Sequence, residues 1–380
     1  MTVVPMIKHT AAEETLFGIE SQNDDVLGSL KESGLPTRRI ESWHYTDLRT
    51  LLKAVPATTV DPEVGDVAMF TGCNLLEAGD APKAASDFSD DDAIGKLNAS
   101  FATKGVELSI LGDASGSPFL VPAMVSNGAT HTRNAIDIGN GAKGTVIEHH
   151  GAVEGFSTTV TNLTVGDDAE VTYVISQQTD RASTHLGQIN VSLGANAKLT
   201  IFILNAGGQL IRQEVNVTVA GEGADFQLRG VNLIGDNQHI DVTMDLHHSV
   251  PNTESEEILR NVVVGKGHGI FQGKIRVAQI AQKTDAKMAC NTLLLSDDGN
   301  FSTKPELEIF ADDVLCGHGA TFADIEPSYM FYLMSRGIPE REARALLIKG
   351  FVDEIVEDIN NEALESAMVD VIDSWLDANG

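Results

Sequence analysis

The chain has 380 residues, of which 42% are hydrophobic and 21% charged, a composition typical of a folded globular protein and not of a disordered one. Its 55 acidic and 26 basic residues give a net charge of −29, which disfavours nucleic acids and anionic membrane surfaces as partners. We find no signal peptide and no membrane-spanning stretch, and three cysteines are an odd and sparse set for a disulfide framework, so we expect a cytoplasmic protein with free thiols.

Residues 1–125 are predicted to form an N-terminal region of mixed and helical structure. Apolar residues recur at helical spacing over residues 10–33, and the pattern ends at Gly34, with Pro36 close behind. The segment 41–49 contains Trp43 and Tyr45, and the remainder of the region is rich in Asp and Gly. We therefore expect one helix over residues 10–33, followed by irregular chain.

Residues 126–325 carry a weak internal repeat made of short β-branched runs. Gly141, Gly166, Gly194 and Gly221 each begin a segment with turn-type residues next, a small residue at the fourth place and an apolar residue at the sixth. These glycines are 25, 28 and 27 residues apart, and a fifth candidate at Gly265 comes 44 residues later, which suggests an irregular coil or an insertion.

A period in the high twenties built from short strands favours a β-solenoid, in which stacked coils pair their backbones and bury one continuous core. The alternative is a β-sandwich whose hairpins happen to be evenly spaced. Periodicity favours the solenoid but does not exclude the sandwich.

Residues 326–380 are predicted to form a C-terminal helical region. One helical pattern covers residues 329–334 and ends at Gly337, a second begins at Pro339, and a third covers residues 364–376. A helical region at this place would cover the exposed end of a solenoid.

Motifs of common enzyme classes are missing from the sequence. A phosphate-binding loop would need a lysine followed by Ser or Thr, but Lys274 is followed by Ile275. There is no nucleophile elbow and no metalloprotease or CxxC motif. Neighbouring histidines, such as His149 and His150, would point to opposite faces of a strand and could not chelate one ion together. We expect a non-enzymatic protein.

Cys316 and His318 are the candidate metal-binding pair in the sequence. Residues two apart on a strand face the same way, so a thiolate and an imidazole would project together as metal ligands. Cys290 lies 26 residues earlier, close to one repeat, and could stack beside Cys316 on the adjacent coil. The competing interpretation is two inert cysteines and a structural histidine, since free Cys is among the most buried residue types.

Several segments resemble the SufB/SufD family of iron–sulfur cluster assembly proteins, and its SufD branch in particular. They are residues 282–286, 291–297, 304–309, 311–321, 335–338 and 350–351, together with residues 41–46 near the N-terminus. The resemblance implies a right-handed parallel β-helix with helical regions at both ends of the chain. Cys290 stands where the SufB branch has its cluster-related cysteine, which leaves its role open.

The resemblance also implies partners and a cargo. A family member of this type would be a scaffold that pairs with SufB through the β-helix and helps to acquire iron and form clusters at the SufB–SufD interface. The cluster would be transient and shared with SufB, with His318, Cys316 and Cys290 as the candidate metal-binding residues. The ATPase SufC would dock on the C-terminal helical region at Arg336, Gly337, Leu347 and Phe351, so this chain itself would bind no ATP.

Two rival functions remain at this stage. A β-helix carbohydrate lyase or hydrolase would be expected to show more than 5% aromatic residues and a secretion signal. A purely structural solenoid would form homo-oligomers, and a homodimer of the isolated chain is expected to be possible because β-helices expose sheet surface. The sequence leaves open whether a flavin is involved.

Overall fold

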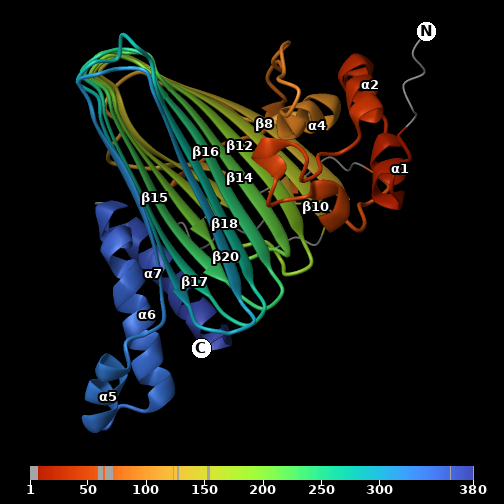
Figure 1. Ribbon diagram of the computed structural model, residues 1–380. Helices are drawn as coiled ribbons and strands as arrows, with labels where there is room; N and C mark the ends of the chain where they lie inside the picture. The colour runs from red at the N-terminus through yellow and green to blue at the C-terminus, as the bar shows by residue number, and fades with distance from the viewer. Residues whose placement is uncertain are drawn as a thin grey trace.

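The computed structural model describes residues 7–58, 63–64, 72–122, 124–125, 128–151, 155–359 and 361–379. The chain winds as a tall solenoid, with helices of the N-terminal region on one flank and helices of the C-terminal region on the other (Figure 1). Successive strands alternate between two sheets, so each strand pairs with strands one coil earlier and one coil later.

The strands of the described chain have the following bounds. The first sheet contains, in spatial order, β20 (Asn300–Ile309), β18 (His268–Val277), β16 (His239–His248), β14 (Leu210–Val219), β12 (Thr184–Leu193), β10 (Phe156–Val165), β8 (Ala129–Ile138), β4 (Lys104–Gly105) and β3 (Gly79–Asp80), with β5 (Glu107–Ile110) also on β8. The second contains β2 (Asn74–Leu75), β6 (Phe119–Val121), β9 (Lys143–His150), β11 (Glu170–Gln177), β13 (Lys198–Asn205), β15 (Asp225–Ile234), β17 (Glu254–Val263), β19 (Asp285–Leu294) and β21 (Leu315–Ala323). A short antiparallel ribbon joins β1 (Glu63–Val64) to β7 (Met124–Val125).

Parallel pairing decides between the two architectures that the repeat allowed. Every pairing between strands β8 to β21 is parallel and connects one coil to the next. Hairpins of a sandwich would pair neighbouring strands antiparallel. The predicted mainly β fold, a parallel β-helix with helices toward both ends of the chain, is therefore confirmed.

One corner of the coil is built from residues in the left-handed backbone region. Positive φ angles of 53–75° occur once at this corner in each coil from β8–β9 to β18–β19, and the backbone N–H of each residue donates to a carbonyl of the following coil; the residues are Gly141, Asp168, Asn196, Gly223, Asn252 and Lys283. Glycine and asparagine tolerate this conformation best, which explains the glycine-rich repeat.

The repeat alignment needs two corrections. Gly139, and not Gly141, is equivalent to Gly166, because both donate to the last residue of a strand one coil earlier. Gly265 lies at the opposite corner, between β17 and β18, and so does not begin a fifth copy of the same turn. Both corners need tight turns, and glycine alone does not distinguish them.

The core of the solenoid fills the space between the sheets. Inward-facing side chains stack in rows along the solenoid, as in the row Ile138, Val165, Leu193 and Val219, in which every side chain is buried. Because each row continues through successive coils, no single coil has to bury its apolar face alone.

The helices of the N-terminal region pack on the outer face of the first sheet. They are α1 (Ala11–Phe17), α2 (Asp24–Ser33), η1 (Glu41–Trp43), α3 (Leu48–Leu51) and α4 (Ala93–Phe101). The single helix expected over residues 10–33 is in fact two helices, because Gly18 ends the first and the Asn23 side chain caps the second. Gly34 ends α2 with a φ of 70°, as predicted.

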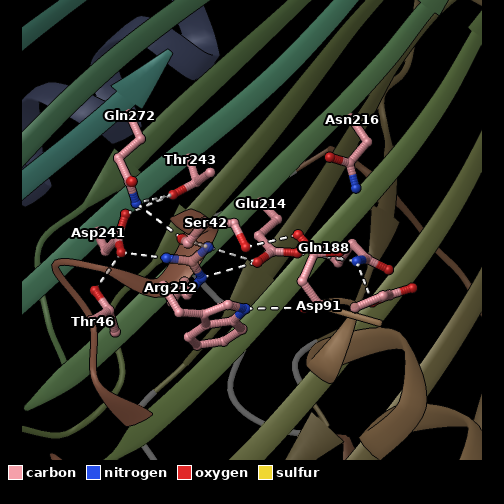
Figure 2. A network of polar contacts seen from close by, with 12 residues as sticks. Ser42, Thr46, Asp91, Gln188, Arg212, Glu214, Asn216, Asp241, Thr243 and Gln272 are labelled. Carbon is pink, nitrogen blue, oxygen red and sulfur yellow. Dashed lines mark hydrogen bonds and ion pairs between the residues drawn. The ribbon is translucent and has the colours of Figure 1, made fainter. Parts of the chain in front are cut away.

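A buried polar network attaches this N-terminal region to the sheet (Figure 2). The fully buried guanidinium of Arg212 on β14 pairs with Glu214 at 2.8 Å and with Asp241, and donates to the Ser42 carbonyl at 2.8 Å. It also stacks on the Trp43 ring at 3.9 Å. A buried charge is tolerated only when it is paired and hydrogen-bonded in this way, so the segment around Trp43 is anchored to the solenoid.

The C-terminal helices are α5 (Pro327–Ser335), α6 (Glu340–Val356), η2 (Glu357–Ile359) and α7 (Glu362–Asn379). Helices α6 and α7 pack on the outer face of the second sheet, where α6 contacts β15 and β17, and α5 packs on α6. The expectation that they cover the end of the solenoid is wrong: they cover its side, because the outer face of the second sheet carries the apolar residues that α6 and α7 need (Figure 1). No helix in the described chain is long and apolar enough to cross a membrane.

Candidate metal-binding site in the last coil

Strands β20 and β21 form the last coil and leave the solenoid open. Each is the terminal strand of its sheet, so one backbone edge of each lacks a strand partner in the part of the chain that the structure describes. Residues of β21 are almost all exposed, whereas the equivalent residues of β19 are largely buried. The last coil is therefore the point where the solenoid interior reaches the surface.

The structure places Cys316 and His318 on β21, both on the side that faces the interior. Cys316 pairs with Ala286 and His318 pairs with Met288, and both of these β19 residues belong to the buried core. Cys316 is half-buried and His318 is exposed. The predicted same-face arrangement of a thiol and an imidazole is thus present at the open end.

Cys290 does not stack beside Cys316, and this expectation is corrected. The register places Cys290 opposite Ala320, because residues of β19 and β21 that pair are 30 positions apart and not 26. The two cysteines are therefore four residues apart along the strand direction, roughly 13 Å. Cys290 is also buried, so it does not belong to a surface cluster.

Burial affects both thiols in the same direction. Burial raises the pKa of Cys290 to about 11, although contacts with Asn261, Thr303 and Thr292 oppose the effect, and the Asn261 amide donates to its sulfur at 3.3 Å. Burial also raises the pKa of Cys316, with smaller contributions from the charges of Asp285 and Glu257. Both groups are therefore thiols, not thiolates, in the metal-free chain at neutral pH, and metal binding must displace their protons.

The site is incomplete within the isolated chain. No three His, Cys, Asp or Glu side chains of the described residues are arranged to hold a metal ion. His318 is exposed and makes no hydrogen bond or ion pair with other described residues, so its ring is available to a ligand. Two ligands on an open edge can start a metal site but cannot close one, since thiolate and imidazole sites usually need four ligands.

Apolar side chains surround the open end. Ile309 and Phe310 at the end of β20, and Leu315 and Phe322 on β21, are between 37% and 71% exposed. Exposed apolar residues beside unpaired strand edges mark an interaction surface, because both features are liabilities in a monomer. We call these four residues the open-end surface.

A second apolar surface lies on α5, which has no buried residue. Tyr329, Phe331, Tyr332 and Met334 are 45–74% exposed on this helix, and α5 projects away from the solenoid (Figure 1). We call these four residues the α5 surface.

The predicted partner-binding residues fall into two groups. Arg336 and Gly337 are exposed directly after α5, and the Arg336 guanidinium stacks on the Tyr332 ring at 4.7 Å. Leu347 and Phe351 are partly buried where α6 packs on the second sheet. Arg336 and Gly337 therefore extend the α5 surface, whereas Leu347 and Phe351 also help to pack α6 on the second sheet.

Glu257 is a residue that sequence reasoning missed. It lies on β17 with its side chain fully buried among interior residues. The alternation of exposed and buried residues in β17 could have placed it inside, but the neighbouring Glu254 and Glu256 made the segment look like a solvated acidic run.

Comparisons with known proteins find similar sequences. Residues 121–351 match the family described as "SUF system FeS cluster assembly, SufBD core domain". The chain is 28% identical to the iron–sulfur cluster assembly protein SufD of Escherichia coli, with 90% of each chain covered. It is 27% identical to an iron–sulfur cluster assembly SufBD family protein of Synechocystis, with 90% of this chain and 87% of the relative covered.

Proposed function

This chain belongs to the SufBD core-domain family of the SUF iron–sulfur cluster assembly system, and from that premise we propose that it is a non-enzymatic scaffold subunit of the cytoplasm. It takes part in iron–sulfur cluster assembly, the process named in the descriptions of the matched family and of the two relatives above. The finer proposal is that it pairs with SufB, docks SufC, and contributes to iron acquisition and cluster formation at the interface with SufB.

The observation that carries this proposal is the thiol and imidazole pair on the open edge. Cys316 and His318 supply ligands of the types that bind iron and iron–sulfur clusters, and they stand on a terminal strand of the solenoid, whose backbone edge another chain could approach. The missing ligands would then come from SufB, and the transient cluster would be shared between the two chains. The role of Cys290, one coil beneath the pair, would be to support the site from inside the core.

The open-end surface supports pairing with SufB, and the α5 surface supports docking of SufC. Aromatic side chains are frequent anchors of protein interfaces, and Tyr329, Phe331 and Tyr332 on α5 are all exposed. SufC would supply the ATP hydrolysis. In the absence of SufB, the open-end surface would also allow two copies of this chain to pair.

The test is co-expression of the full chain with SufB and SufC, followed by purification and by iron and sulfide analysis. We expect the wild-type chain to retain both partners and a cluster. His318→Ala should retain both partners but lose roughly tenfold or more of the iron and sulfide, because one ligand is missing. His44→Ala, which removes another exposed histidine, is the control.

Two results would contradict the proposal. A wild-type chain that retains neither SufB nor SufC would remove the scaffold function. A His318→Ala complex with the iron and sulfide content of wild type would place the cluster elsewhere.

A further inference from the structure

The N-terminal helices rest on two buried histidines of the first sheet. Helices α1, α2, η1, α3 and α4 pack together on the outer face of this sheet, and we call residues 7–52 and 93–101 the helical layer. His131 on β8 lies under α4, and His239 on β16 lies under the segment between η1 and α3. Neither histidine is more than 8% exposed. Each half of the layer therefore covers one ring that can take up a proton.

His131 occupies an aromatic environment. Its ring centroid is 5.1 Å from that of Phe101 on α4 and 5.8 Å from that of Phe156 on β10. Nδ1 is 2.8 Å from the Thr158 hydroxyl, and Nε2 has no hydrogen-bond partner among the described residues. The next charged residue along this face of β8 is a cation, Arg133. Burial lowers the pKa of His131 to about 3, so the covered ring is neutral.

His239 is held neutral by its hydrogen bond to the layer. Nε2 is 2.9 Å from the Thr46 hydroxyl, which donates its one proton to Asp241 (Figure 2). The hydroxyl must therefore accept from Nε2, so a second ring proton would have to enter at Nδ1. Burial lowers the pKa of His239 to about 4; Asp241 on the same strand opposes this effect, whereas His268 on β18 and Arg212 on β14 add to it.

The acids at this interface do not reverse the effect of the histidines. Burial raises the pKa of Glu214, so this one acid acts against them. Burial also acts to raise the pKa of Asp91, but hydrogen bonds from Ser89 and Ser42 lower it, so Asp91 keeps its charge in mildly acidic solution. Two histidines against one acid leave a net uptake of protons when the layer is exposed to water.

The solenoid does not depend on the layer for its backbone pairing. Strands β8 to β21 pair with strands of the neighbouring coils. Among the described residues, no backbone–backbone hydrogen bond joins the layer to these strands, and the contacts between them involve side chains, as in the Arg212 network. The layer can therefore leave the sheet without breaking a strand ladder.

We propose that the helical layer is an acid-sensitive cover, which leaves the first sheet as one unit in mildly acidic solution while the solenoid stays folded. This inference does not depend on the proposed function. At a pH below 6.5 the released state binds more protons than the covered state, so the free energy that holds the layer falls as the pH falls. By pH ~4, each histidine raises the equilibrium constant for release by roughly 100-fold.

The chain carries a fluorescent reporter on each flank, since its two tryptophans are Trp43 in the layer and Trp375 in α7. Trp375→Phe leaves Trp43 as the only tryptophan, and the substitution should be tolerated because the Trp375 indole N–H has no hydrogen-bond partner among the described residues. The experiment is an acid titration of this full-length variant. We expect Trp43 emission to shift to the red between about pH 6.5 and 4, before the β-sheet signal in circular dichroism changes.

Two substitutions in this background test the histidines. His131→Asn and His239→Gln keep a hydrogen-bonding group at the position of the bonded ring nitrogen but cannot take up a proton. Each should lower the midpoint of the Trp43 transition by about half a pH unit or more, because one of two titrating groups is lost. His44→Gln, which removes an exposed histidine of the same layer, should keep the original midpoint.

Coincident changes of the Trp43 emission and the β-sheet signal would overturn the inference, as would an unchanged midpoint in both histidine variants. Should these variants fail to fold, hydrogen exchange of the wild-type chain gives the answer. Between pH 7 and pH 5, amides of α2 should lose about tenfold or more of their protection, after correction for the intrinsic exchange rate, while those of β14 keep theirs. Unchanged protection of α2 would overturn the inference.

Discussion

Burial makes Glu257 a residue with a large expected effect on the pH dependence of folding. Burial raises its pKa from 4.5 to about 8 in the folded chain, and the nearby charges of Arg229 and Glu256 act in opposite directions on it. In the unfolded chain the group loses its proton near its ordinary pKa. Between these two values the unfolded state binds fewer protons than the folded state, so the free energy of unfolding falls as the pH rises.

Glu257→Gln should remove this contribution. The difference in unfolding free energy between variant and wild type is expected to grow in favour of the variant from pH ~5 to pH ~8, by on the order of 3 kcal/mol. Urea unfolding at several pH values measures it, and Glu256→Gln should follow the wild-type profile. If the free energies of unfolding of Glu257→Gln and wild type change with pH in parallel, the Glu257 carboxyl group is already ionised in the folded chain.

The corner turns are the elements that set the solenoid geometry. Each coil from β8–β9 to β18–β19 passes once through the left-handed backbone region at the corner from the first sheet to the second. Gly141 is the informative member of this series, because its φ is 68° and an added Cβ would meet no atom within 4 Å. Any effect of adding a methyl group there comes from the backbone alone.

Gly141→Ala is therefore expected to lower the free energy of unfolding by about 1 kcal/mol, the cost of an L-residue in the left-handed region. Gly116→Ala is the control, since it also meets open space but lies outside that backbone region, and it should have no such cost. Denaturant unfolding compares the two. Equal stability of both variants would mean that the corner relaxes to another conformation.

At the scale of the whole molecule, the two ends of the solenoid differ in what they leave uncovered. The last coil exposes the open-end surface, including Phe310 at 66% exposure beside the free edge of β20. At the opposite end, Leu111 after β5 is 81% exposed and Leu75 on β2 is 49% exposed. A partner that continues the solenoid beyond its last coil would cover the open-end surface and leave Leu111 in solvent.

Phe310→Ser should lower the retention of SufB by tenfold or more in a quantitative pull-down, because an aromatic residue at the centre of an interface contributes about 2 kcal/mol or more. Its melting temperature should match that of wild type, since the side chain is exposed. Leu111→Ser, an equally exposed apolar residue, should retain SufB. Full retention by Phe310→Ser would place the SufB contact on another surface.

Local patterns in the sequence determined much of the architecture. The β-branched runs and glycine turns predicted a solenoid, the glycine and proline signals placed Gly34 and Gly337 at helix ends, and the spacing of Cys316 and His318 predicted that they share a face. All of these depend on neighbours within a few residues, where strand alternation and turn chemistry apply directly.

Only the tertiary structure decided which residues of different coils meet. The register between β19 and β21 depends on the lengths of two corners and both strands, so a coil of 30 residues in place of 26 moved Cys290 opposite Ala320. The same register placed Glu257 in one row with His318, inside a strand that reads as acidic. Which flank receives the C-terminal helices likewise depends on the apolar outer face of the second sheet, which forms only when several coils stack.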